Sequence, residues 1–115
     1  MQNTRSEFEL LVTKALADIP LQFQYRLENV DVVVEDVPSK DQIASSFVGD
    51  EDCLIGLYEG VPLTELNDYG DVLPDRICLF QSSIESLCND EDEIQDEIKK
   101  IVIQEITHHF GMHDD

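Results

Sequence analysis

The sequence has few basic residues: 7 Lys and Arg stand against 26 Asp and Glu, which gives a formal net charge of −19. A surface this acidic repels the phosphates of nucleic acids and anionic membranes, so we expect neither as a partner. The same charge attracts basic peptides or basic patches on other proteins. A simpler alternative is that the charge only keeps a small protein soluble. The expected partner is a peptide or protein, preferably a basic one, and the oligomeric state is left open.

The sequence also lacks a cysteine pair, a signal segment and a long apolar run. Its three cysteines, Cys53, Cys78 and Cys88, form no C-x-x-C motif and are odd in number. This favours free thiols in a reducing compartment over a disulfide framework. The first residues, MQNTRSEFELL, do not have the charged-then-apolar pattern of a signal peptide, and no apolar stretch approaches the length of a membrane span. We therefore expect a soluble, cytoplasmic protein.

The length of the chain limits its organisation. With 115 residues it can bury one hydrophobic core but not two. Hydrophobic residues make up 42% of the chain, which is enough for a globular fold despite the charge. Because no repeat or low-complexity tract divides the sequence, we expect a single domain over residues 1–115.

Two segments have the pattern of helices. The first opens with a capping box, Thr4 to Glu7, and continues with apolar residues at helical spacing until Pro20 ends it. The second is expected to begin near Asn89 as N-cap, with four acidic residues at its positive end. Gly111 suits the left-handed turn that closes such a helix. The expected buried stripe of this second helix is Ile94, Ile98, Ile101 and Val102.

Three segments between these helices predict strands. Residues 29–38 are rich in valine and alternate, whereas residues 53–60 are apolar on both faces and are therefore expected near the centre of a sheet. Residues 76–80 are the third strand. Residues 39–52 predict a loop or a short irregular helix, and residues 61–75 a long connection of a length that is more often functional than not. The expected class is α+β, with a small sheet and a helix at each end of the chain.

The C-terminal segment IVIQEITHHFGMHDD lacks one residue of a metal-binding motif. A helix carrying H-E-x-x-H binds zinc through both histidines and uses the glutamate as a general base. Glu105 and His108 stand in the right places, but Gln104 occupies the place of the first histidine. Continuing the buried stripe by helical steps from Ile101 leads to Glu105 and His108, so we expect a polar cluster on the inward face. A purely structural alternative is that Gln104, Glu105 and His108 bond to one another and to the sheet.

The spacing after this helix supplies a third ligand position. Zinc in catalytic sites takes three protein ligands and a water, and positions 104, 108 and 114 place the third ligand at Asp114, with Glu105 beside the water as base. The oxygen of a glutamine amide is a poor zinc ligand, so we expect low zinc occupancy. Three alternatives would still allow the site to bind a metal ion: His113 replaces the missing histidine, Glu105 becomes a ligand, or Gln104 binds a harder metal than zinc through its oxygen. Cys78 is a less favoured ligand, since buried cysteines are usually inert packing.

These residues resemble the small bacterial zincin-like metallopeptidases, whose motif is H-E-x-x-H-x-x-G-x-x-D. The segments LENVDVVVEDVP, LIGLYEGVPLTEL and LPDRICLF are also similar to segments of that family, in the same order, so the likeness extends from Phe8 to Asp114. It implies a minimal zincin-like fold, a mixed sheet with the active-site helix packed beneath it. It also implies that His108 is the second zinc ligand, Asp114 the third and Glu105 the general base, with Gln104 departing from the motif.

Three functions follow as hypotheses. The first is a zinc metallopeptidase with weakened activity, in which a substrate strand pairs with an exposed sheet edge, expected to be residues 76–80. The second is a non-catalytic pseudoenzyme that binds an extended peptide in the same cleft. The third is an acidic module that recruits basic partners through charge alone.

Overall fold

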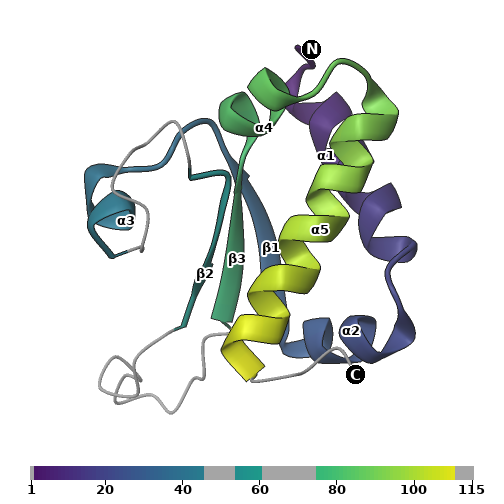
Figure 1. Cartoon of the computed structure of the whole chain (residues 1–115), viewed down its shortest axis with the longest axis vertical. Helices are drawn as coiled ribbons and strands as arrows, with labels where there is room; N and C mark the ends of the chain where they lie inside the picture. The colour runs from purple at the N-terminus through teal and green to yellow at the C-terminus, as the bar shows by residue number, and fades with distance from the viewer. Residues whose placement is uncertain (1, 46–53, 61–74, 111–115) are drawn as a thin grey trace.

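The computed structural model describes residues 2–45, 54–60 and 75–110 of the chain. In these residues a three-stranded sheet carries helices on both sides, and α1 and α5 lie against the same face (Figure 1). The elements, in chain order, are α1 (Arg5–Ala17), α2 (Leu21–Arg26), η1 (Leu27–Asn29), β1 (Val30–Glu35), α3 (Lys40–Ser45), β2 (Gly56–Glu59), β3 (Asp75–Phe80), α4 (Gln81–Leu87) and α5 (Glu91–Phe110). The expected α+β class, with a mixed sheet and a helix at each end, is confirmed.

The strand order corrects two expectations about the sheet. The order is β1-β3-β2, with β3 parallel to β1 and antiparallel to β2. The segment 53–60, expected at the centre, instead forms β2 at an edge of the described sheet, and all four of its strand residues are only half-buried. The segment 76–80, expected at an exposed edge, is the core of the central strand β3, and residues 77–80 are buried. A short segment that is apolar on both faces can be a central strand or an edge strand covered by a helix. This pattern therefore did not distinguish the two positions.

The first helix forms as its sequence predicts. The backbone amide of Glu7 donates to Thr4 Oγ1 at 3.1 Å, and the amide of Thr4 donates to Glu7 Oε1 at 2.9 Å, so the capping box is complete. The helix ends at Ala17, three residues before Pro20. Its inward residues Phe8 and Leu11 are buried in the main core.

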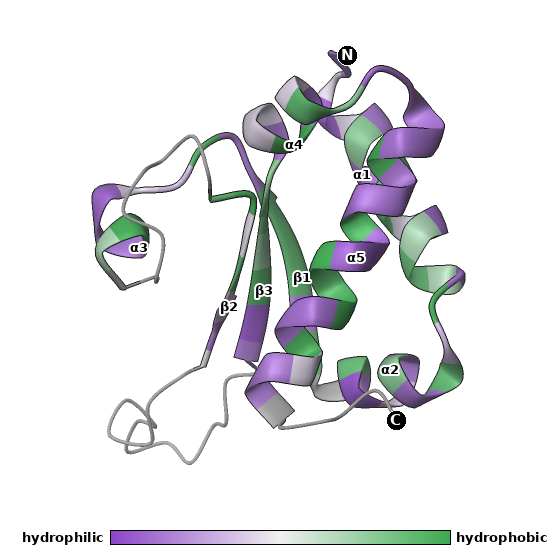
Figure 2. Cartoon of the chain, in the orientation of Figure 1, coloured by the Kyte–Doolittle hydropathy of each residue, from purple (hydrophilic) through white to green (hydrophobic). Residues whose placement is uncertain are grey.

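The last helix begins one residue later than expected. Its cap is Asp90, whose Oδ1 accepts from the amide of Glu93 at 2.8 Å, while the amide of Asn89 donates to the Glu93 carboxylate at 3.1 Å. Apolar residues alternate along α5 with polar ones at helical spacing (Figure 2). The predicted buried stripe of this helix is confirmed: Ile94, Ile98, Ile101 and Val102 are each no more than 4% exposed.

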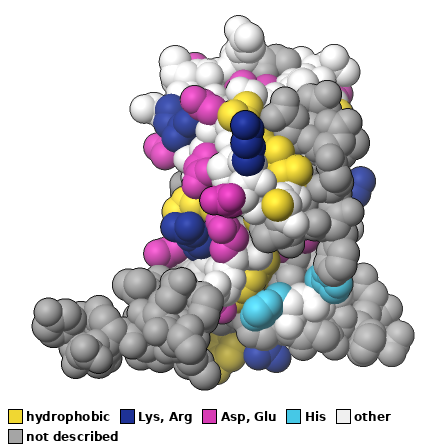
Figure 3. Space-filling model, turned by 90° about the vertical axis from the view of Figure 1, so that its left-hand side faces the viewer, with side chains coloured by type: hydrophobic (Ala, Val, Ile, Leu, Met, Phe, Trp, Pro, Cys, Tyr) yellow, Lys and Arg dark blue, Asp and Glu magenta, His cyan; other side chains and the backbone are white. Residues whose placement is uncertain are grey.

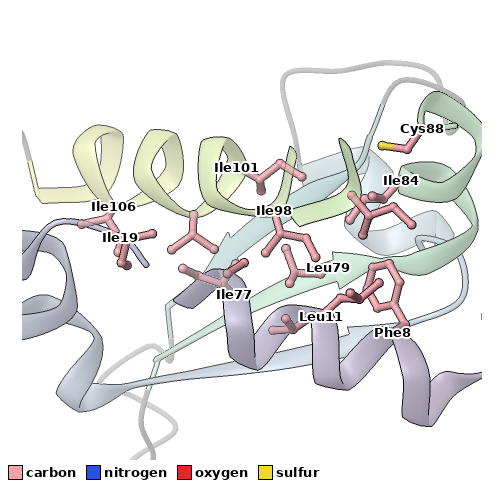
Figure 4. Close-up of a cluster of buried hydrophobic side chains, with 14 of the residues drawn as sticks. Phe8, Leu11, Ile19, Ile77, Leu79, Ile84, Cys88, Ile98, Ile101 and Ile106 are labelled. Atoms are coloured by element: carbon pink, nitrogen blue, oxygen red, sulfur yellow. The ribbon is translucent and has the colours of Figure 1, made fainter. Parts of the chain in front are cut away.

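Two apolar clusters lie on opposite faces of the sheet. The main cluster joins α1, α5 and one face of the strands, and Ile77 and Leu79 supply the contribution of β3 (Figure 4). The alternate residues of β3, Cys78 and Phe80, pack with Leu54 in a second, smaller cluster. Because successive side chains of a strand point to opposite faces, this second cluster lies on the side of the sheet away from α5.

The sequence patterns do not predict every helix of the structure. They predict neither α2 nor α4, whereas α3 falls within the segment 39–52, where a loop or a short irregular helix is expected. In α4, Gln81 and Glu85 are buried, and Glu85 Oε2 accepts from the amide of Asn3 at 2.8 Å and from Gln81 Nε2 at 3.2 Å. The bond between Asn3 and Glu85 joins segments far apart in the chain, and such a contact leaves no periodic pattern in the sequence. None of the described helices combines the length and apolar character of a membrane span.

A glycine sets how closely α5 approaches β2. A Cβ atom placed on Gly56 would overlap Ile101 Cγ2, which belongs to a branched side chain held in the core. We expect Gly56→Ala to destabilise the fold by about 1–3 kcal/mol, because the helix must shift away from the strand. Urea unfolding measures the loss. The matched control is Gly60→Ala, where the nearest atom is an Asp75 carboxylate oxygen at 3.6 Å, and equal losses in both variants would contradict the close-packing explanation.

Candidate functional site

The C-terminal half of α5 turns a different face to the core than the sequence indicates. The buried line runs Ile98, Val102, Ile106, whereas Glu105 is half-buried and His108 is exposed. The expectation that Glu105 and His108 continue the inward face is therefore wrong for His108. The buried residues in this half of the helix are spaced four apart. Residues 101, 105 and 108 therefore lie on a line that turns away from the core toward the side of the helix.

Glu105 is bonded to the edge of the sheet. Its Oε1 accepts from the backbone amide of Tyr58 in β2 at 3.0 Å. In an antiparallel pair, alternate residues direct their amides toward the partner strand and away from it. The amide of Tyr58 donates to Glu105, so this amide faces away from β3. The Glu105 carboxylate thus covers a backbone N–H group at the outer edge of β2 in the described sheet.

The ring of Tyr58 fastens the last described turn of α5 to the sheet. It stacks on His109, with ring centroids 3.9 Å apart and an interplanar angle of 17°. Its hydroxyl donates to Asp75 Oδ2 at 2.7 Å, and His109 Nε2 lies 3.9 Å from the same oxygen. Burial raises the pKa of the Tyr58 hydroxyl, and the bond to the Asp75 carboxylate raises it further. This three-residue clamp was not predicted, since no spacing in the sequence pairs positions 58, 75 and 109.

The motif residues are placed side by side along α5, as far as the described residues extend. Gln104 and His108 lie one helical turn apart, and both side chains are exposed. Both described histidines are visible near one end of the face drawn in Figure 3. The expected third ligand Asp114, the alternative ligand His113 and the predicted closing turn at Gly111 lie outside the described residues.

The donor chemistry of the described part does not suit zinc. His108 offers an imidazole nitrogen, but Gln104 offers only a neutral amide oxygen where zinc prefers nitrogen, thiolate or carboxylate donors. In residues 2–45, 54–60 and 75–110, no group of three His, Cys, Asp or Glu side chains is arranged to hold a metal ion. Of the two histidine ligands that an H-E-x-x-H helix supplies, the described residues contain one, His108.

Cys78 is not part of this site. Its side chain belongs to the cluster on the far face of the sheet, where Sγ donates to Glu59 Oε1 at 2.8 Å and Gln42 Nε2 lies 3.6 Å away. Burial and the Glu59 carboxylate raise the pKa of the thiol to about 12. Within the described residues Cys78 and Cys88 are not joined by a disulfide, and Cys53 lies outside these residues. The less favoured role of Cys78 as a ligand is therefore wrong, and the expected packing of a buried cysteine is confirmed.

The site thus consists of a polar helix end carrying E-x-x-H, held against an edge strand, which is the arrangement of a zincin-like α+β fold. The family model of the zincin-like metallopeptidases matches residues 27–115, and the chain belongs to this family. A family of metallopeptidases implies, in general, zinc and peptide hydrolysis. The particular ligands and activity of this chain are a separate question.

Similarity to individual proteins adds the fold. A conserved hypothetical protein from Thermus thermophilus superposes with a TM-score of 0.57 at 20% identity, and the match covers 94% of each chain. At this identity the likeness shows a shared fold and nothing of activity. No curated protein is significantly similar in sequence.

Proposed function

We propose that this protein binds extended peptides beside α5 and that its degenerate metal site makes peptide hydrolysis slow or absent. The observation that carries the proposal is Gln104, an exposed amide one turn before His108 on the helix that bears the family motif. In this assignment His108 and Asp114 are metal ligands and Glu105 is the general base, as the motif implies. With Gln104 in the first place, the ligand set retains too little affinity for zinc at low concentration.

The edge of β2 is the docking position we assign to the peptide. β3 is flanked by strands on both sides, so it cannot accept another strand, and of the two outer strands of the described sheet β2 is the one in close contact with the C-terminal half of α5. An extended peptide gains affinity there from main-chain hydrogen bonds, which do not depend on its sequence. The net charge of −19 favours basic peptides.

Two measurements on the same proteins test this function. A fluorescein-labelled peptide of alternating threonine and lysine is titrated with the wild-type protein, and binding is followed by fluorescence polarisation. Cleavage of labelled, unfolded casein is then measured with added zinc for the wild type, Gln104→His, and Gln104→His combined with Glu105→Gln. We expect binding but background cleavage for the wild type, zinc-dependent cleavage for Gln104→His, and its loss in the double variant.

Particular results would contradict each part. Efficient zinc-dependent cleavage by the wild type would show that the site is not degenerate. Cleavage that survives Glu105→Gln would remove Glu105 from the role of base. No peptide binding by any variant would overturn the docking position.

The acidic-module function is the second candidate, and the net charge of the chain favours it. It differs in its salt dependence, because binding through charge alone weakens steeply as the Debye length shortens. Raising the salt from about 0.1 M to about 1 M shortens that length from about 10 Å to about 3 Å. If binding of the same peptide is abolished by salt, charge is the cause, whereas strand pairing leaves a substantial part of the affinity.

A further inference from the structure

The hydrogen bond between Tyr58 and Glu105 occupies the donor that strand pairing needs. A peptide that adds to β2 must bring a carbonyl oxygen to an outward-facing amide of that strand. In the described structure the outward amide of Tyr58 already donates to Glu105 Oε1 at 3.0 Å. The acceptor is a half-buried carboxylate, and hydrogen bonds to charged acceptors are stronger than those to carbonyl groups.

We infer that this bond, which we call the edge lock, is an autoinhibitory contact that excludes a peptide from β2 until the Glu105 side chain moves away. The inference rests on the proposed docking of peptides at β2. A peptide carbonyl that takes the Tyr58 amide releases the Glu105 carboxylate. Peptide binding and release of the Glu105 carboxylate, the proposed base, therefore occur together. In the free protein this carboxylate stays bonded to β2.

The surroundings of the edge lock allow the side chain to move without the helix. The end of α5 is fastened independently by the stack of Tyr58 on His109 and by the bond from the Tyr58 hydroxyl to Asp75 at 2.7 Å. On the other side, Ile101 and Ile106 anchor the helix in the core. Rotation of Glu105 about its own bonds is thus the smallest change that exposes the amide.

The experiment measures affinity for the threonine–lysine peptide in wild type, Glu105→Ala and Glu105→Gln. We expect Glu105→Ala to bind about tenfold more tightly, because no carboxylate competes for the amide. Glu105→Gln retains a weaker, neutral acceptor and should bind about threefold more tightly. The sign is decisive, since removing an acidic group from a site that simply attracts a cationic peptide weakens binding.

The matched control is Glu97→Ala, which removes the same charge from a half-buried position two turns earlier on α5. Its affinity should stay within about twofold of the wild type. Unchanged or weaker binding by Glu105→Ala would overturn the edge lock while leaving the docking position intact. A failure of every protein to bind the peptide would overturn the docking position and the lock together.

Amide hydrogen exchange of Tyr58, followed by NMR without peptide, provides a readout that does not depend on binding. We expect exchange at this amide to be at least about tenfold faster in Glu105→Ala than in the wild type and to slow again when peptide is added. If the Tyr58 amide exchanges equally in both proteins, the bond to Glu105 does not protect it and no lock exists.

Discussion

Replacing Gln104 with histidine is expected to raise the zinc content of the purified protein from well below one ion per chain to about one. The substitution restores the nitrogen donor that the family motif places one turn before His108. Gln104 is exposed, so the new ring needs no rearrangement of the core. Zinc per chain is counted by mass spectrometry on protein from zinc-supplemented cells.

The expected change in affinity is large because few ligands share the binding energy. Dedicated structural zinc sites bind with about 10–16 kcal/mol in total through four ligands, so one ligand contributes roughly 2.5–4 kcal/mol, or about 10²- to 10³-fold in the dissociation constant. A competition titration with a zinc chelator resolves a difference of this size. The free energy of unfolding without zinc should be nearly unchanged, which separates a ligand effect from a folding effect.

The matched control is Gln22→His, which adds an imidazole at an exposed position on α2. It should bind no more zinc than the wild type. Tight stoichiometric zinc in the wild type would show that Gln104 is an adequate ligand or that His113 replaces it. Weak binding by Gln104→His would instead show that positions 104, 108 and 114 do not form the ligand set.

The sequence predicts the helices well where local chemistry decides. The Thr4 to Glu7 capping box and the buried stripe of α5 depend on residues three or four positions apart, and both are found as expected. The cap at Asp90 instead of Asn89 is a shift of one residue between two good capping types. Such features are specified within one turn of chain.

Strand order and the contacts of the site depend on residues far apart in the chain. The central position of β3 follows from its pairing with β1 and β2 on either side, and the length and apolarity of 76–80 do not reveal that pairing. The sequence correctly singles out Glu105 as unusual, because a carboxylate next to a buried stripe needs a partner. That partner is the backbone of Tyr58, and a backbone donor has no sequence signal at all.

Deprotonating Cys78 is expected to weaken the fold steeply above about pH 9. The side chain is fully buried, and its Sγ donates to the Glu59 carboxylate at 2.8 Å. Burial first, and then the bond to Glu59 and the charges of Glu59 and Glu35, raise the pKa of the thiol from 9.0 to about 12, against a smaller opposing effect of Arg76. A folded-state pKa above the unfolded one gives stability that is complete below the unfolded value and is lost as pH rises toward the folded value.

The window for this loss is therefore pH 9 to about 12, with a slope of about 1.4 kcal/mol per pH unit. Urea unfolding of the wild type and of Cys78→Ala at about pH 8, 9, 10 and 11 isolates the thiol, because the other groups that titrate in this range are common to both proteins. The stability advantage of the wild type should shrink by about 2–3 kcal/mol between about pH 9 and 11. The companion variant Cys88→Ala should converge less, because the pKa of Cys88 is also raised by burial and by the charges of Glu97 and Glu93, but less strongly than that of Cys78. A constant difference between wild type and Cys78→Ala across this range would show that the thiol ionises as easily in the folded chain as in the unfolded one, which the buried contact with Glu59 does not permit.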